Sequence, residues 1–93
     1  MDQTSFLELG KYLREKRLSK KLTQVQVAKS LGYTSQFIAN WERGVSSPPL
    51  EVLRQVIDMY SINLRDFSHT INEIQQDYWK RNIFSKKSKN KNK

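Results

Sequence analysis

Amides and hydroxyls, rather than catalytic groups, stand out in one short stretch of this sequence, at Ser35, Gln36 and Asn40. Glutamine and asparagine each donate and accept, and either can pair with adenine through N6 and N7. A serine hydroxyl also does both, so it tolerates several partners. The chemistry open to this stretch is hydrogen-bonded recognition of a base edge. The alternative is that Gln36 and Asn40 are solvated residues on an exposed helix.

Catalysis and metal binding have little support. The chain has no cysteine, and its one histidine, His69, has no second histidine with which to build a metal site. No paired carboxylates, nucleophile–base set or glycine-rich phosphate loop stands out. We therefore expect no enzyme, no metal and no cofactor. A small protein without disulfides suits a reducing compartment.

Positive charge is concentrated in two regions. The net charge is +8, with +6 in residues 11–29 and +7 in residues 80–93, while residues 30–79 carry −3. Such asymmetry indicates a polyanionic partner or simply a soluble surface. No signal peptide and no apolar run of membrane-spanning length are found, so the expectation is a soluble, cytoplasmic protein.

Two short helices joined by a tight turn are predicted to hold the polar stretch. Thr23 and Gln26 have the spacing of a capping box, and Gly32 is suited to end the helix that this box begins. Thr34 can cap the next helix, which Gly44 ends. Packing between the two helices falls to their apolar residues, which are Val27, Ala28, Leu31, Ile38 and Trp41.

Further helices are predicted on both sides. One spans about residues 5–18, and another begins near Leu50, after a loop that contains Pro48 and Pro49. Asn63 can cap the next helix. Apolar residues recur at heptad spacing from Leu64 to Tyr78, and this segment forms either one long helix or two helices. The expected division is a helix-turn-helix domain over residues 5–67, a helical extension over 68–84 and a disordered basic tail over 85–93.

Residues 13–67 resemble the phage-repressor and Cro-like helix-turn-helix family, also called the XRE family. The match is carried by Leu22-Thr23-Gln24, Val27-Ala28, Leu31-Gly32, the run from Ser35 to Gly44, Pro48, Leu50 and Leu53. This resemblance implies an all-α, five-helix, lambda-repressor-like DNA-binding domain whose third helix reads the major groove.

The resemblance also implies roles for single residues. Base contacts fall to Ser35, Gln36 and Asn40. Because no lysine or arginine precedes Arg43 on this face, A·T pairs are expected to matter in the DNA site. Positions at the DNA backbone or groove edge are Gln24, Thr34, Phe37, Arg43, Ser46 and Ser47.

Three structural questions stay open at this level. Phe37 belongs either to the groove-facing surface or to the core. Arg17 and Glu42 form either the buried ion pair that the resemblance implies or a surface pair of little energetic value. The stripe from Leu64 onward is either internal core or a surface for a partner, for which the candidates are Ile71, Ile74, Tyr78 and Trp79.

The prediction for function is a sequence-specific transcriptional regulator, a repressor, that binds double-stranded DNA as a homodimer. Two alternatives stay open: an antitoxin-type module that binds a small protein through residues 70–84, and a membrane-surface protein held by its basic end. The lysine-rich end has three possible roles, which are DNA backbone binding, membrane attraction and solubility.

Overall fold

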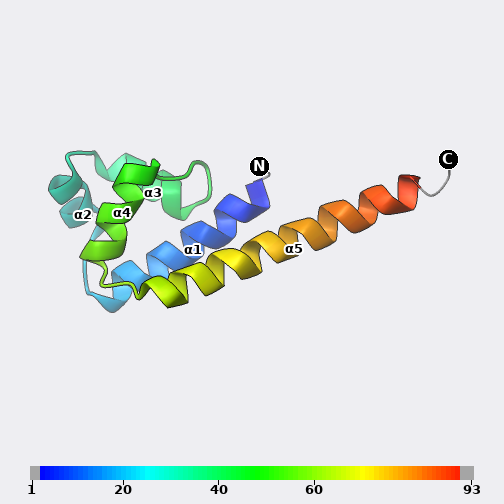
Figure 1. Ribbon diagram of the computed structural model, residues 1–93. Coiled ribbons are helices and arrows are strands. Elements are labelled where there is room, and N and C mark those ends of the chain that lie inside the picture. The colour runs from blue at the N-terminus through cyan, green and yellow to red at the C-terminus, as the bar shows by residue number, and fades with distance from the viewer. Residues whose placement is uncertain (1–2, 91–93) are drawn as a thin grey trace.

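Helices alone make up the regular structure of residues 3–90, the part described by the computed structural model, with side chains described for residues 6–77 and Lys80. The five helices are α1 (Gln3–Ser19), α2 (Gln24–Leu31), α3 (Ser35–Glu42), α4 (Leu50–Met59) and α5 (Leu64–Asn90). Helix α1 lies between α5 on one side and the group α2, α3 and α4 on the other (Figure 1). The expected all-α, five-helix fold is confirmed.

Local signals set the two helices of the turn. Thr23 Oγ1 accepts from the backbone N–H of Gln26 at 3.0 Å, and Gln26 Oε1 accepts from the N–H of Thr23 at 2.8 Å, which is the expected capping box. Gly32 ends α2 with φ of 77°, a left-handed conformation that glycine adopts without a Cβ penalty. Thr34 occupies the N-cap position of α3, but its side chain makes no capping hydrogen bond.

A small core lies between α1 and the three short helices. Ile38, Val27 and Val56 are its largest fully buried side chains. Ala28, 3% exposed, keeps α2 and α3 close because it adds only a methyl group. The other buried hydrophobic residues are Leu13, Trp41, Val52, Tyr60 and Ile62.

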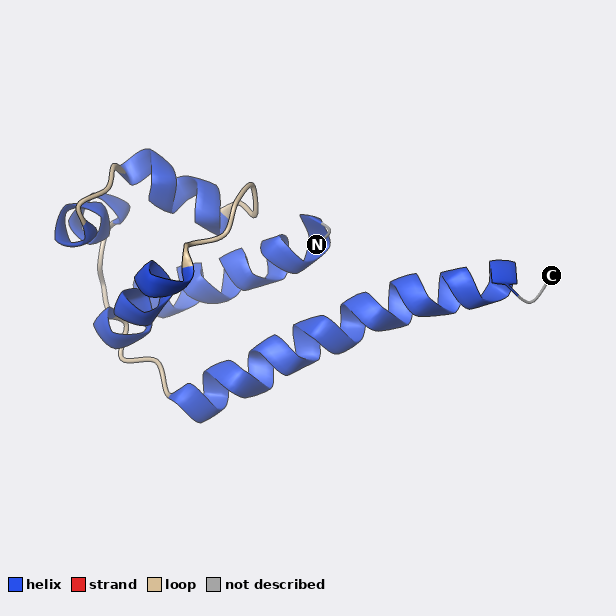
Figure 2. Cartoon of the chain, turned by 45° about the horizontal axis from the view of Figure 1, so that its top comes forward, coloured by secondary structure: helices blue, strands red, loops and turns tan. Residues whose placement is uncertain are grey.

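Helix α5 is a single helix that extends beyond the rest of the molecule (Figure 2). It begins as predicted, because Asn63 Oδ1 accepts from the backbone N–H groups of Arg65 and Asp66 at 2.9 and 3.1 Å. The molecule measures 54 × 27 × 20 Å, and α5 accounts for the long axis.

In the structure α5 continues through residues 85–90, which are part of the segment predicted to be a disordered basic tail. Extending an existing helix requires no new nucleus, lysine is a good helix former, and cations are favoured near a helix C-terminus. Those three effects offset the lack of apolar residues in this segment. Residues 91–93 lie outside the described part of the chain. Within that part, no helix has the length and apolarity to cross a membrane.

Candidate nucleic-acid interface

Helix α3 has a buried side and an exposed polar side. Ile38 and Trp41 are 1% and 5% exposed and hold the helix against the core. Gln36 is exposed, whereas Ser35 and Asn40 are half-buried. The three predicted base-contacting residues are therefore not enclosed by the protein, although two of them lie partly sheltered.

Hydrogen bonds link the exposed side of α3 into a row. Gln36 Nε2 donates to Asn40 Oδ1 at 3.1 Å, and Arg43 Nη2 donates to the same oxygen. Residues four and seven positions apart lie on one helix face, which is why these side chains meet. A guanidinium only donates, so the side-chain oxygen of Asn40 must face Arg43. The amide hydrogens of Asn40 remain for another acceptor.

Phe37 lies neither fully in the core nor fully on the surface, the two positions considered from the sequence. Its side chain is 48% exposed, and its ring lies 5.2 Å from that of Tyr33. Tyr33 in turn meets Trp41 edge-on at 5.6 Å between ring centroids. A line of aromatic rings therefore connects the core to the edge of the α3 surface, and Phe37 is its exposed end.

A buried ion pair holds α3 to α1. Arg17 Nε and Nη2 donate to Glu42 Oε2 and Oε1 at 2.6 and 3.0 Å, while Arg17 Nη1 donates to the carbonyl of Leu22 at 2.7 Å. The two side chains are 7% and 4% exposed. The hydrogen bonds to Glu42 raise the pKa of Arg17 above its ordinary value. This is the pair that the resemblance implies, and it is not a surface pair.

Gln24 joins the same carboxylate from the start of α2. Its Nε2 donates to Glu42 Oε1 at 3.0 Å, and its side chain is part-buried. Glu42, the last residue of α3, thus receives hydrogen bonds from α1 and from α2. This hydrogen bond connects α2 to the end of α3. The contact of Gln24 with a phosphate stays a prediction.

Two glycines let α1 approach the end of α3. A Cβ on Gly10 would lie 2.4 Å from the carbonyl oxygen of Trp41, and one on Gly44 would lie 2.6 Å from the Cα of Leu7. No role for Gly10 was predicted from the sequence. The available signal was a glycine inside a predicted helix, which is unfavourable unless another backbone approaches closely.

The loop after α3 is fastened to the helix beside Arg43. The backbone N–H groups of Val45 and Ser46 donate to the carbonyl of Asn40 at 2.9 and 3.4 Å. Ser46 and Ser47 are half-buried, and Ser47 Oγ donates to the carbonyl of Pro48 at 3.4 Å. Both serines therefore stand on an ordered loop next to the polar row of α3.

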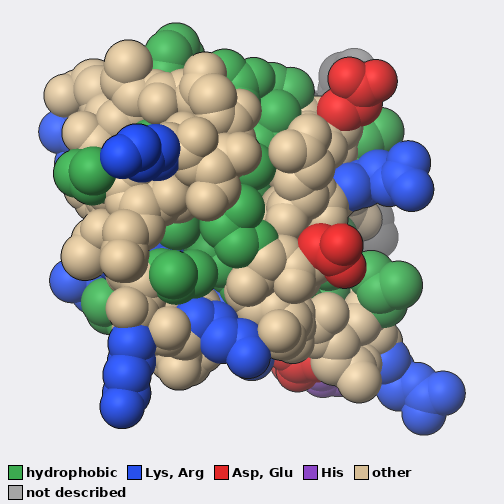
Figure 3. Space-filling model, turned by 90° about the vertical axis from the view of Figure 1, so that its left-hand side faces the viewer, with side chains coloured by type: hydrophobic (Ala, Val, Ile, Leu, Met, Phe, Trp, Pro, Cys, Tyr) green, Lys and Arg blue, Asp and Glu red, His purple; other side chains and the backbone are tan. Residues whose placement is uncertain are grey.

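The space-filling view shows the end of the molecule where α2, α3 and α4 gather (Figure 3). Lysine and arginine side chains project at several points around a largely polar surface. Thr34, Lys20, Lys21, Lys29 and Arg43 are all exposed. The hydrogen-bonding side chains of α3, together with exposed cations elsewhere on the chain, supply the chemistry that base edges and a phosphate backbone require.

Two of the four residues predicted for a dimer or partner surface, Ile71 and Ile74, have described side chains. Ile74 lies between α5 and α1, whereas Ile71 lines a different surface hollow together with Phe67, Asn72 and Gln75. Both isoleucines are half-buried. The side chains of Tyr78 and Trp79 lie outside the described residues.

Comparison with known families gives one match. A helix-turn-helix family model matches residues 13–67, which is more than half of the chain. The matched segment runs from the buried Leu13 to Phe67 and contains α2, α3 and α4 in full. No match was found among curated proteins or among solved structures.

Proposed function

Since the chain belongs to the XRE-type helix-turn-helix family and is a DNA-binding transcriptional regulator, we propose that it reads the major groove with α3. The observation that carries this proposal is the polar row of α3, which faces solvent while Ile38 and Trp41 fix the opposite side in the core. A helix held in this way can enter a groove without being repacked.

The hydrogen-bonded row suggests how bases are recognised. Asn40 Oδ1 accepts from Gln36 and Arg43, so Asn40 presents amide hydrogens to base acceptors. Gln36 keeps its own carbonyl oxygen and a second amide hydrogen, which together match N6 and N7 of adenine. Ser35 accepts or donates according to the base it meets. This combination favours A·T pairs.

Contacts with the DNA backbone supply most of the affinity. Gln24 has one amide hydrogen left after its bond to Glu42, and that hydrogen can reach a phosphate. Arg43, Thr34, Ser46 and Ser47 lie at the edges of the α3 row or on its loop, and half-exposed Phe37 is placed to contact a thymine methyl. Affinity is expected to fall steeply as salt rises, because each neutralised phosphate releases counterions.

We further propose that the protein acts as a homodimeric repressor that blocks a promoter by occupying it. Two copies of α3 would then meet two half-sites about one helical turn apart. The alternative is that residues 70–84 bind a small protein. It predicts a stoichiometric complex of two different chains, without self-association.

Selection of binding sites from random duplexes tests the readout. The full chain should return a partly palindromic, A·T-containing site, and Gln36→Ala should relax one or two base pairs by about 1–3 kcal/mol each. The matched control is Gln55→Ala, the same change at an exposed residue of α4. The proposal that α3 reads bases would be wrong if Gln36→Ala weakened binding equally on every DNA sequence, or if the full chain did not bind duplex DNA at low ionic strength.

A further inference from the structure

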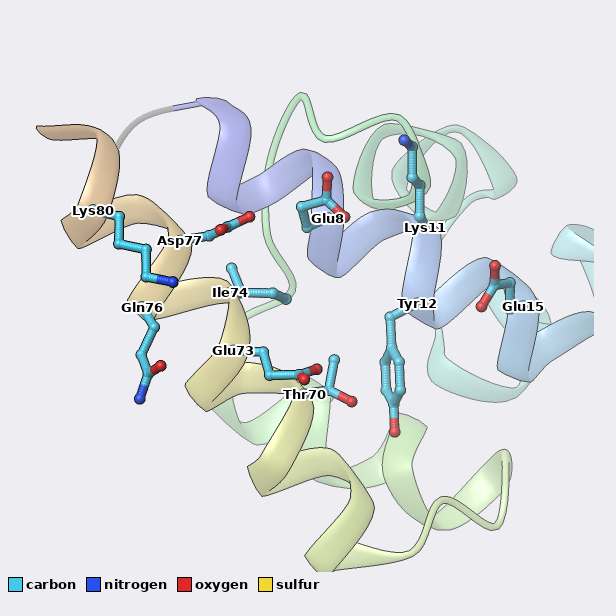
Figure 4. A pocket seen from close by; sticks show the side chains of 10 residues that line it. All are labelled: Glu8, Lys11, Tyr12, Glu15, Thr70, Glu73, Ile74, Gln76, Asp77 and Lys80. Atoms are coloured by element: carbon cyan, nitrogen blue, oxygen red, sulfur yellow. The ribbon is translucent and has the colours of Figure 1, made fainter.

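An open groove of about 560 Å³ separates α1 from the middle of α5 (Figure 4). Its lining includes four carboxylates, Glu8, Glu15, Glu73 and Asp77, and two ammonium groups, Lys11 and Lys80. The charge of the lining is therefore −2 in a protein whose net charge is +8. Apolar surface in the groove comes from Ile74 and the ring of Tyr12.

Contacts at the start of α5 fix one end of the groove. Tyr12 Oη donates to Asp66 Oδ2 at 2.8 Å, and Lys16 Nζ lies 3.4 Å from the same oxygen. The rings of Tyr12 and Phe67 pack with centroids 5.9 Å apart. These bonds attach the first turns of α5 to α1, while its later turns run past the N-terminal end of α1 (Figures 1 and 2). The groove is therefore a fixed feature of the fold.

Helix α5 carries opposite charges in its two halves. Residues 64–79 have one arginine and three carboxylates, a net charge of −2, whereas residues 80–90 have a net charge of +5. Ile83 and Phe84 are the only apolar residues after Trp79. The end of the chain is thus a basic segment with one apolar pair, which complements an acidic groove that Ile74 and the ring of Tyr12 line in part.

Apart from Lys80, which lines the groove, the chain's own basic segment does not reach its own groove. Because α5 is one helix to Asn90, residues after Lys80 lead away from the groove at about 1.5 Å per residue, some 15 Å in all. A second copy has no such restriction. Antiparallel pairing about residue 77, the midpoint of α5, sets residues 80–90 of one copy opposite residues 64–74 of the other. Parallel pairing would instead set the two +5 segments against each other.

We propose that this groove is the docking site for residues 80–90 of a second copy, so that two α5 helices pair antiparallel and each basic end occupies the other copy's groove. The proposal deepens the homodimer of the proposed function and rests on it. The contact is isologous, as a two-fold dimer requires, because each copy supplies one groove and one basic segment. Self-association should weaken as salt rises, since exposed charge pairs are screened.

Charge reversal, followed by sedimentation of the full chain without DNA, tests the proposal. A groove variant carries Glu8→Lys and Glu15→Lys, and an end variant carries Lys86→Glu and Lys87→Glu. Each alone should weaken dimerisation by roughly tenfold or more, because several charge pairs become repulsive at two symmetric contacts. An equimolar mixture of the two variants should dimerise again, because the two reversed groove positions of one variant then face the two reversed end positions of the other, while the unchanged groove faces an unchanged basic end. That recovery also shows that both variants are folded.

Matched controls carry the same charge changes elsewhere. Glu51→Lys with Asp58→Lys alters two exposed carboxylates of α4, and Lys20→Glu with Lys29→Glu alters two exposed lysines. Both controls should keep the dimerisation constant of the parent.

Three results would overturn the docking site: a parent protein that is monomeric at every concentration tested, single variants that dimerise like the parent, or a mixture that stays monomeric. Retained dimerisation with a smaller salt dependence of DNA binding in the end variant would assign the lysines to phosphate instead. These readouts are independent of base recognition, so a failure of Gln36 in site selection leaves them intact.

Discussion

Removing the charge of Glu42 should destabilise the protein more than any conservative surface change. In Glu42→Gln the side chain keeps its shape, but Arg17, 7% exposed, retains a buried charge without its counter-ion. Breaking one partner of a buried pair costs about 3–5 kcal/mol. A domain of this length has a total stability of about 5–14 kcal/mol. At about 4–8 °C per kcal/mol, Tm should fall by roughly 12–40 °C.

Urea unfolding followed by circular dichroism measures this change, with Glu73→Gln as the matched control. Glu73 also faces a basic partner, His69 at 3.4 Å, but both side chains are about two-thirds exposed at 67% and 70%. Its neutralisation should change stability by less than about 1 kcal/mol. Replacing both buried partners, in Arg17→Met with Glu42→Leu, should be less harmful than Glu42→Gln alone. A loss below about 1 kcal/mol in Glu42→Gln, or a double variant that is worse than the single one, refutes the reasoning.

Two further predictions concern backbone fit and pH. Gly10→Ala should lower the free energy of unfolding by more than Gly32→Ala. The Cβ at position 10 meets the backbone of Trp41, whereas the Cβ at position 32 has nothing within 4 Å and bears only the left-handed penalty of about 1–2 kcal/mol. Equal losses in urea titrations would contradict the close approach. Burial raises the pKa of Tyr60 to about 12, above its ordinary value of 10.0, so its contribution to stability is complete below pH 10 and is lost between pH 10 and 12. The free energy of unfolding of the parent should therefore fall relative to that of Tyr60→Phe across that range; a constant difference would show that Tyr60 does not titrate there.

Much of the fold was predictable because its signals are local. The capping box of Thr23 and Gln26, the left-handed Gly32 and the Asn63 cap each act within four residues, and each is present as predicted. Apolar spacing likewise placed Ile38 and Trp41 in the core. Local chemistry also has limits: Thr34 occupies the expected position, but its hydroxyl makes no capping bond.

The features that the sequence did not reveal depend on distant contacts. Gly10 matters because the C-terminal carbonyls of α3 lie against it, more than thirty positions along the chain. The groove exists because Tyr12 bonds Asp66, 54 positions away. The state of residues 85–90 depends on the helix that precedes them, since their own composition favours disorder.

The carboxylate of Glu42 bears on both the stability of the fold and the proposed recognition of DNA. Glu42 ends α3, and it receives Arg17 from α1 and Gln24 from α2 within 3.0 Å. If Gln24 also binds a phosphate, two consecutive hydrogen bonds set the distance between that phosphate and the base-contacting residues of α3. One joins the phosphate to Gln24, and the other joins Gln24 to Glu42. A change at Arg17 that leaves the protein folded would still loosen this spacing, and base recognition depends on it because phosphate contacts fix the register on DNA. We therefore expect the buried pair to contribute to recognition as well as to folding, although neither Arg17 nor Glu42 is exposed enough to touch DNA.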